Sequence, residues 1–334
     1  GNRQSGSPSL DDFFNQTNED GVFTRPQDAF RPNYIAGWIQ DKFAYDDLVF
    51  NVGVRVDRLD LNQSVLVDPY VLFPTVRAGE EEARNLAAEM EGGYQVPGNI
   101  GDNYVVYVDN VQSPTRITGY RNGDTWYSAE GAEVSDASTI RSNGQAIPLL
   151  QDKDQTTSNQ LTSASFVDYD PQINFMPRIS FSFPISEEAL FYAHYDVLTR
   201  RPTDRGSQTV ARLDLYEYYY LDQQSGDFIA NNPNLRPERV IDYSIGFKQK
   251  VTNSAAISIE AFYREFRDQI QLIGVQDAFP RQYFTFGNID FATIKGLIFK
   301  FDLRKTQNLT LRFAYTPQFA EGTGSNSFSA LNLV

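Results

Sequence analysis

A single histidine and the absence of cysteine leave few groups in the sequence that could carry acid–base or nucleophilic chemistry. His194 alternates with Tyr192 and Asp196 in a strand-like stretch. A Ser-His-Asp relay needs a serine activated at a sharp turn, and the Gly-x-Ser-x-Gly pattern that provides such a turn does not occur. We therefore predict that His194 is a hydrogen-bonded polar residue and that the chain is not an enzyme.

Carboxylates are abundant, but their spacing does not form a metal-binding motif. Asp152-Lys-Asp154 begins like a calcium-binding loop, yet Thr157 stands where the turn glycine is needed and no glutamate closes the loop. We predict no metal site and no cofactor. Weak calcium binding in the acidic loops stays open, because the density of carboxylates there is high.

The ligand-binding candidates are aromatic and basic side chains outside the strands: Trp126, Tyr127, Arg200, Arg201, Tyr218 and Tyr219. The two arginines could bind an anionic solute or a lipid phosphate, and the four rings could stack on a ligand. The same side chains could instead be rim charges, packing residues inside folded loops or part of an interfacial aromatic belt. We favour the structural role for these side chains, and ligand contact stays open as the alternative.

The elements that position these residues are strands, because apolar and polar side chains alternate with a period of two over long stretches. In Leu48–Val56 the apolar residues share one face, whereas Asn51 and Arg55 lie on the other. The other alternating segments are 34–42, 173–183, 191–197, 241–247, 257–263, 297–303 and 309–315. The longest apolar runs have five residues, Tyr104–Val108 and Ala189–Ala193, whereas a membrane helix needs about 20. Helical membrane proteins are therefore excluded.

The connections between these strands alternate between short and long along the chain. The short ones are Ala44–Asp47, Pro184–Glu188, Thr252–Ser254 and Lys305–Asn308, and the long ones are roughly 59–171, 200–238 and 266–290. In an antiparallel meander this order puts all tight turns at one end of the sheet and all long loops at the other. The pattern predicts an all-β fold, an antiparallel transmembrane outer-membrane β-barrel with periplasmic turns and long extracellular loops.

A soluble sandwich or jelly roll is the competing interpretation of the alternation. Its strands usually have about 5–6 residues, and its long connections need not lie on one side. A sandwich also hides the apolar face of each sheet against the other sheet. Here the second face of nearly every strand carries Arg, Lys, Asp, Glu or His. A wet barrel lumen accounts for those charges, so we favour the barrel.

The charge distribution suggests four regions along the chain. Residues 1–33 read as a loop or linker, 34–58 as barrel strands, 59–171 as a long acidic extracellular loop, and 172–334 as barrel strands and loops. The long loop carries 17 acidic and 6 basic residues, a net charge of −11 out of −14 for the chain. Within it, Glu80–Met90 predicts a short helix, and Tyr104–Val108 and Thr115–Tyr120 predict strands. The acidic balance disfavours nucleic acid as a partner.

Three motifs carry a resemblance to a known family. Asn232-Pro-Asn-Leu-Arg-Pro-Glu238 precedes a strand, Phe286-Gly-Asn-Ile-Asp-Phe-Ala-Thr-Ile-Lys-Gly296 leads into a later one, and Phe175-Met-Pro-Arg-Ile-Ser-Phe181 begins a hairpin. Together they resemble TonB-dependent outer-membrane receptors, in the form typical of Bacteroidetes. The motif residues to which we assign structural roles are Asn232, Pro233, Leu235, Pro237, Glu238, Asn288, Asp290, Lys295 and Gly296.

The residue types suggest what those structural roles are. Pro233 and Pro237 stiffen the segment before the strand, because proline cannot donate a ladder hydrogen bond. Arg236 and Glu238 are expected to pair at the rim or to bind a cation. The lumen-facing glycines Gly246 and Gly296 leave room beside a bulky neighbour or a plug.

The resemblance implies a barrel of about 22 strands, a bacterial outer-membrane location and uptake of a scarce solute such as a siderophore, glycan or peptide. It also implies four kinds of partner: membrane lipid and lipopolysaccharide, an N-terminal plug domain, an inner-membrane energy-coupling complex acting through the plug, and a surface lipoprotein. About eight spanning strands and no plug-like region are visible, so we expect a middle-to-late part of a barrel, cut at both ends. The alternatives are a structural or secretion-complex component that uses a receptor-like barrel for docking, and a soluble surface enzyme or lectin.

Overall fold

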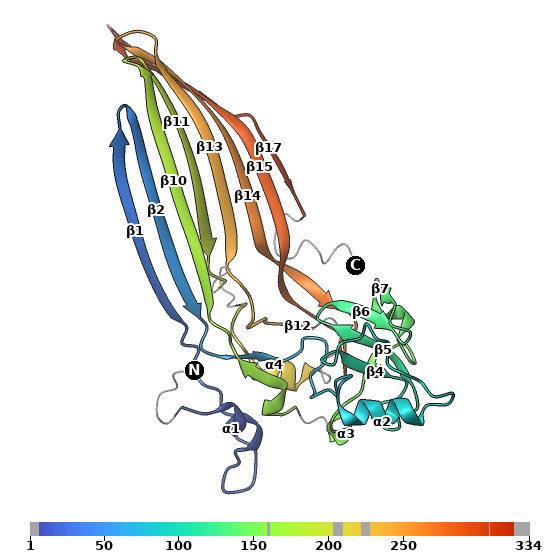
Figure 1. Ribbon diagram of the computed structural model, residues 1–334. Helices are drawn as coiled ribbons and strands as arrows, with labels where there is room; N and C mark the ends of the chain where they lie inside the picture. The colour runs from blue at the N-terminus through green and yellow to red at the C-terminus, as the bar shows by residue number, and fades with distance from the viewer. Residues whose placement is uncertain (1–6, 159–160, 203–209, 222–227, 307, 324–334) are drawn as a thin grey trace.

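The computed structural model describes residues 7–158, 161–202, 210–221, 228–306 and 308–323, which form a long curved sheet with a layer of folded loops at one end (Figure 1). The sheet has the order β1-β2-β10-β11-β13-β14-β15, with β16 and β17 also paired to β15 and the short β12 beside it. Its strands are β1 (Asn33–Tyr45), β2 (Leu48–Asp60), β10 (Gln172–Ser186), β11 (Ala189–Arg200), β12 (Ile229–Ala230), β13 (Glu238–Lys250), β14 (Ala255–Val275), β15 (Tyr283–Thr306), β16 (Leu309–Tyr315) and β17 (Gln318–Gly322). All the pairings are antiparallel except that of β12 with β15.

The register of the sheet gathers the apolar side chains on one face. Directly opposed residues share a face, so Phe43, Phe50 and Phe181 form a continuous row across β1, β2 and β10. Neighbouring ring centroids in this row are 5.2 and 6.1 Å apart. The row lies near the tight turns, where an aromatic belt meets the edge of a bilayer. This face is the lipid-facing one.

The opposite face carries ion pairs between neighbouring strands. Arg178 of β10 contacts Asp196 of β11 at 2.5 Å, and Arg264 of β14 contacts Asp242 of β13 at 2.6 Å. Gly246 leaves room there for a neighbouring ring, because a Cβ at this position would overlap the phenol of Tyr192. The polar face therefore has the composition of a barrel lumen, and the room expected beside Gly246 is confirmed.

The tight turns lie together at one end of the sheet, as predicted. Three of them are 46–47, 187–188 and 251–254. The fourth, between β15 and β16, includes residue 307 and lies partly outside the described residues. The predicted long loop at 266–290 is wrong: β14 continues to Val275 and β15 begins at Tyr283, so the connection has only the residues 276–282.

Burial on both faces explains why this part of the hairpin does not look like strand in the sequence. Ile270, Gln271 and Leu272 are consecutive, and each is no more than 3% exposed. A strand covered on both sides has no reason to alternate between apolar and polar residues. The hairpin therefore extends out of the bilayer into the core of the loop layer.

The loop layer contains the helices and the remaining strands of the described residues. They are α1 (Leu10–Asn15), β3 (Ser64–Leu66), α2 (Glu81–Glu89), β4 (Val105–Val108), β5 (Ile117–Asn122), β6 (Thr125–Ser128), β7 (Glu133–Val134), η1 (Ala137–Thr139), β8 (Ile147–Pro148), α3 (Asp154–Ser158), η2 (Ser163–Ser165), β9 (Phe166–Asp168) and α4 (Leu215–Tyr219). None of the helices in the described part of the chain is long and apolar enough to cross a membrane. The predicted helix at 80–90 and strands at 104–108 and 115–120 correspond to α2, β4 and β5.

Residues 61–171, which we call the loop unit, fold around a five-stranded sheet of order β7-β6-β5-β4-β8. The helix α2 places Ala83, Leu86 and Ala87 in a core with the Val106 and Val108 side of this sheet. The opposite side packs in a second core that includes Tyr107, Trp126 and Ile140. With apolar side chains covered on both faces, the loop unit has a hydrophobic core of its own.

The N-terminal segment also has structure that the prediction of a loop or linker did not include. Ser9 caps α1 in a capping box with Asp12, a pairing that stabilises the first turn. Phe13 and Phe14 are buried in a core shared with Leu215 and Tyr218 of α4. Segments about 200 residues apart in the chain therefore pack together in the loop layer.

Candidate functional site

The loop unit leaves the sheet after β2 but attaches to the hairpin of β14 and β15, four to five strands away (Figure 1). The backbone of Tyr70 and Leu72 exchanges hydrogen bonds with Phe279 in that hairpin. The phenol of Tyr283 donates to the Pro69 carbonyl at 2.8 Å, and Arg141 forms an ion pair with Asp277 at 2.7 Å. The loop unit therefore spans the loop end of the sheet rather than extending freely from it.

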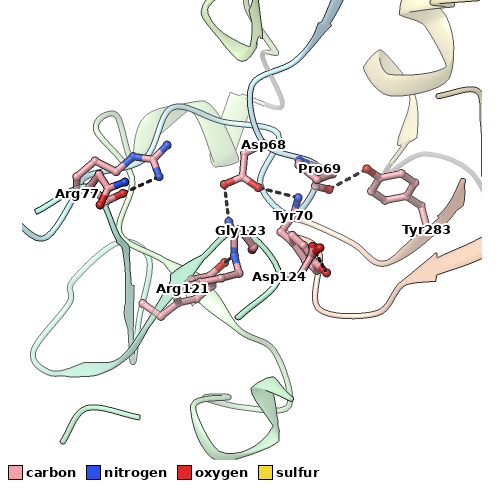
Figure 2. Close-up of polar contacts among 10 residues, drawn as sticks. Asp68, Pro69, Tyr70, Arg77, Arg121, Gly123, Asp124 and Tyr283 are labelled. Atoms are coloured by element: carbon pink, nitrogen blue, oxygen red, sulfur yellow. Dashed lines mark hydrogen bonds and ion pairs between the residues drawn. The ribbon is translucent and has the colours of Figure 1, made fainter. Parts of the chain in front are cut away.

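A buried ion pair between Arg121 of β5 and Asp68 lies at the centre of this attachment (Figure 2). Their side chains are only 3% and 8% exposed. The Arg121 guanidinium also donates to the Tyr107 hydroxyl at 2.8 Å and to the Gly123 carbonyl at 2.7 Å. A buried charge is tolerated when its donors are satisfied in this way, so the pair fixes the local geometry.

Aromatic rings surround the Arg121 guanidinium. Its carbon lies 4.6 Å from the centroid of Tyr70 and 5.5 Å from that of Trp126, within the range of cation–π contact. Burial, and next the negative charge of Asp124, raise the pKa of Tyr70 to about 12. The Tyr70 hydroxyl therefore stays protonated at neutral pH and donates to Asp124 at 3.2 Å.

A pocket of about 200 Å³ opens beside this ion pair. Its wall is made by four separate segments that contribute Val67, Asp68, Pro69, Tyr70, Arg77, Asn103, Val105, Arg121, Asn122, Gly123 and Asp124. The exposed polar groups include the amides of Asn103 and Asn122 and the carboxylate of Asp124. Amide, carboxylate and guanidinium groups around one aromatic ring can hydrogen-bond a small polar solute and cover its apolar side.

A second pocket, of about 280 Å³, lies where the N-terminal segment meets the base of the loop layer. Its polar lining includes Asp60, Gln63, Asp168 and Arg212. The Gln63 amide is committed to structure, because it donates to the Ala211 carbonyl at 2.6 Å and accepts from the Leu213 amide at 2.9 Å. This pocket is therefore a junction between packed segments, and the first pocket is the better candidate site.

The aromatic ligand-binding candidates lie mainly in the cores of the loop layer. Trp126 is 5% exposed and Tyr218 is 3% exposed. Tyr127 packs against Tyr104 with ring centroids 5.3 Å apart, and the Tyr219 hydroxyl accepts a hydrogen bond from Arg25 at 2.7 Å. Packing accounts for these positions, and ligand contact by them stays a prediction.

The two basic candidates lie at the loop end of β11. Arg200 is 3.8 Å from the carboxylate of Glu238, and the Arg201 guanidinium lies 4.4 Å from the centroid of Tyr34. The six candidates are therefore not brought into one site. Among the contacts of the described residues, Trp126 touches the wall of the 200 Å³ pocket, through Arg121 and Tyr70.

The wall residues of the candidate pocket could not have been selected from the sequence. Tyr70, Asn103 and Asp124 lie in different segments and share no spacing pattern. Their proximity results from the fold of the loop unit and from its attachment to the hairpin. A hydrophilic loop residue carries no local signal that distinguishes a pocket wall from an ordinary surface.

The first two family motifs bind each other across the sheet. Asn232 donates from its side chain to the Phe286 carbonyl at 2.7 Å. The Asn288 side chain accepts from the Arg236 amide at 2.8 Å and donates to the carbonyls of Arg236 and Asp268 at 2.9 and 2.8 Å. Asparagine suits this position because its side chain both donates and accepts.

The remaining motif residues pair with strand neighbours. Glu238 accepts from the Ile270 amide at 3.1 Å in addition to its contact with Arg200, whereas Arg236 pairs with Asp268 at 3.3 Å. The ion-pair partners of Arg236 and Glu238 thus differ from the Arg236–Glu238 pair that we expected. The others are structural as well: Leu235 is fully buried, Pro233 and Pro237 are buried, Asp290 accepts from Thr323, and Lys295 lies 4.0 Å from Glu321.

Gly296 occupies a position where a side chain has no space. A Cβ there would lie 2.6 Å from the Pro317 carbonyl oxygen and 2.8 Å from the ring of Phe262. The room that we expected beside this glycine is taken by a bulky neighbour, the Phe262 ring, and by the Pro317 carbonyl.

His194 has a serine and an aspartate as neighbours. Its Nδ1 is 2.7 Å from the Ser244 hydroxyl, and its Nε2 is 3.8 Å from Asp242. Ser244 lies in the middle of β13, paired on both sides, so neighbouring backbone amides are engaged in the sheet and do not form an oxyanion site. His194 thus forms the predicted hydrogen bond, and this bond joins two neighbouring strands.

Acidic side chains do not converge on a metal site in the described residues, where no group of three or more His, Cys, Asp or Glu is placed to hold an ion. Weak calcium binding by the acidic loops stays a prediction.

The sequence profile described as "TonB dependent receptor-like, beta-barrel" matches residues 2–331. A search of the curated proteins finds no match. Among solved structures, the Escherichia coli ferric-catecholate import receptor Fiu in its closed form aligns at 13% identity and a TM-score of 0.41, over 88% of this chain and 28% of that one. The Serratia marcescens hemophore receptor HasR, in complex with HasA and heme, aligns at 12% identity and 0.42, over 86% and 34%. The chain thus spans about a third or less of these structures.

The profile match covers almost the whole chain, including the three motifs and the strands between them. The family resemblance inferred from the motifs and the all-β outer-membrane barrel fold are therefore confirmed, with the sheet forming part of a barrel. The Bacteroidetes form and the total of about 22 strands stay predictions.

Proposed function

Because the chain belongs to the family of TonB-dependent receptor-like β-barrels, we propose that it is part of a receptor that binds a scarce solute and takes it up by energy-coupled transport. Proteins of this family are transporters rather than enzymes, and they lie in the bacterial outer membrane. The expectations of a non-enzymatic protein and of an outer-membrane location follow from that membership.

The observation that supports solute capture is the attachment of the loop unit to the β14–β15 hairpin. It holds the 200 Å³ pocket at the loop end of the strands, on a floor fixed by the buried Arg121–Asp68 pair. A pocket with a preformed floor binds without having to order its walls first. The wall residues Tyr70, Asn103 and Asp124 supply a ring, an amide and a carboxylate to the solute.

The net negative charge of the loop unit favours neutral and cationic solutes over anionic ones. With 16 acidic and 6 basic residues over 61–171, its field attracts cations and repels polyanions. Of siderophores, glycans and peptides, a neutral glycan or a neutral or cationic peptide therefore suits the pocket best. A polyanionic ferric siderophore suits it least.

Energy coupling requires partners beyond this chain. A plug domain would fill the lumen against the polar strand face, and an inner-membrane complex would act on that plug. A surface lipoprotein that covers the loop layer is a further proposed partner. These assignments belong to the whole protein, of which the chain is a section.

Uptake by cells that carry the full-length protein in the outer membrane tests the proposal. We would measure accumulation of a ¹⁴C-labelled neutral oligosaccharide, a ¹⁴C-labelled cationic oligopeptide and a ⁵⁵Fe-labelled anionic siderophore, with and without a protonophore. We expect one of the first two probes to accumulate and the protonophore to abolish its accumulation. Asn103→Ala with Asn122→Ala should weaken binding of that probe by about tenfold, since two solute hydrogen bonds are removed.

Asn85→Ala, on the exposed side of α2, is the matched control and should leave accumulation unchanged. Equal accumulation by cells that lack the protein would contradict transport. Accumulation of the siderophore alone would contradict the solute class. If no probe enters while the protein co-purifies stoichiometrically with a secretion or surface complex, the docking alternative replaces transport.

A further inference from the structure

The lipid-facing side of β13 and β14 ends in two arginines at the loop end. On β13 the exposed side chains Tyr243, Ile245 and Phe247 alternate with buried residues, and Arg239 is exposed in the same phase. On β14, Tyr263 and Arg267 lie on the same face of the sheet as these residues. The register pairs Arg239 directly with Arg267, so the two side chains lie next to each other on the outside of the sheet.

Two like charges directly opposite each other on neighbouring strands destabilise a sheet. Within the described residues, Arg239 forms no ion pair, and Arg267 contacts one carboxylate, that of Glu265, at 2.9 and 3.1 Å. The three side chains together keep a net positive charge. The contact with Glu265 uses Nε and one terminal nitrogen of Arg267, which leaves the guanidinium with further N–H donors.

The depth of this pair in the membrane follows from its distance to the tight turn 251–254. Arg239 lies 12 residues before Val251, the first residue of that turn. Twelve residues of strand span about 40 Å, or about 28 Å along the bilayer normal for a tilt of about 45°. The apolar band of an outer-membrane barrel is about 25 Å tall. The pair is therefore at the level of lipid headgroups on the loop side of the membrane.

We propose that Arg239 and Arg267 form a binding site for a phosphate group of an outer-leaflet lipid. A phosphate between the two guanidinium groups removes the repulsion across the strands and receives paired N–H donors from each side. Glu265 holds one edge of the Arg267 guanidinium, and the remaining N–H donors of Arg267 stay available beside Arg239. The site lies on the face opposite the lumen, so it is independent of the solute pocket and of the proposed transport.

Native mass spectrometry of the full-length protein in detergent tests the site. The probes are purified lipid A, the same lipid after enzymatic removal of its phosphates, and inorganic phosphate. We expect the wild type to retain lipid A, and Arg239→Gln with Arg267→Gln to weaken retention by about tenfold or more, because charge-assisted hydrogen bonds are lost. Arg312→Gln, an exposed arginine on the other face of the sheet, is the control and should retain lipid A like the wild type.

A thermal measurement on the same samples separates binding from folding. Without lipid, Arg239→Gln should raise the midpoint of unfolding, because it removes the like-charge pair; with lipid A present, the wild type should gain more than the variant. Equal retention of dephosphorylated lipid A, or of lipid A by the double variant, would overturn the proposal. If millimolar inorganic phosphate displaces lipid A completely, the site is one for soluble phosphate and the lipid assignment is wrong.

Discussion

Glu217 in α4 shows how one buried side chain can make a loop sensitive to pH. Its carboxylate accepts from the Asn231 amide at 2.7 Å. Burial nevertheless raises the pKa of Glu217 from its ordinary value near 4.5 to about 7. The folded state then holds the proton more tightly than the unfolded state between these values, so local stability falls as pH rises from about 4.5 to 7 and is level above that.

We predict that Glu217→Gln removes this dependence, since glutamine keeps the acceptor for Asn231 and carries no charge. Hydrogen exchange of residues 228–231 in the full-length protein is the measurement. Between pH 5 and pH 8, and after correction for the intrinsic exchange rate, wild-type protection should fall by roughly tenfold or more, and that of the variant should stay level. Glu19→Gln, in the exposed N-terminal turn, should follow the wild type. Parallel profiles for wild type and E217Q would contradict the assignment.

At the scale of elements, Asn288 joins three segments. Its side chain makes hydrogen bonds of 2.8–2.9 Å to Arg236 and Asp268, and Asp268 has a positive φ of 56° where the register of β14 shifts. We predict that Asn288→Ala lowers the free energy of unfolding in lipid by about 2–4 kcal/mol, because one donor amide and two carbonyls lose their partner. Urea titration of the full-length barrel checks this value.

Asn51→Ala is the matched control for Asn288→Ala. Asn51 makes one long side-chain hydrogen bond, of 3.3 Å to Ser180. Its replacement by alanine should lower the free energy of unfolding by less than about 1 kcal/mol. An equal loss of unfolding free energy in the two variants would show that the hydrogen bonds of Asn288 between the motifs stabilise the barrel no more than an ordinary side-chain hydrogen bond does.

The elements also show which parts of the fold could be predicted. Strands with one face in lipid and one in the lumen alternate, so 48–56 and 241–247 were recognisable from sequence. The ends of β14 and β15 were missed because Ile270, Gln271 and Leu272 are covered on both faces. The capping box of Ser9 and Asp12 was a usable signal for α1 that the interpretation as linker ignored. The walls of the pocket had no signal, since they meet only in the folded loop unit.

At the scale of the whole molecule, the loop unit is joined to the barrel through a narrow neck. β3 and β9 form an antiparallel pair, with Val65 opposite Val167, so the chain leaves and returns at neighbouring positions. We predict that replacing residues 67–165 by a four-residue turn leaves a barrel that inserts and shows heat-modifiable mobility in gels. It should lose the solute binding assigned to the 200 Å³ pocket.

Insertion of the same four residues between Gly92 and Gly93, in an exposed turn of the intact unit, is the control and should preserve both insertion and binding. A replaced variant that no longer inserts would show that the loop unit is needed for the barrel itself. One that inserts and still binds would place the solute site elsewhere.

The attachment of Pro69 to Tyr283 joins residues 214 positions apart in the chain. Contacts of such long range form late, because the intervening strands must first be paired. The loop unit can therefore collapse around its own core early but dock only after the β14–β15 hairpin exists. Docking of the loop unit therefore reports that the β14–β15 hairpin has formed. A barrel whose assembly stops after β13 would keep an undocked loop unit that proteases can cleave, which distinguishes it at the cell surface from a finished barrel.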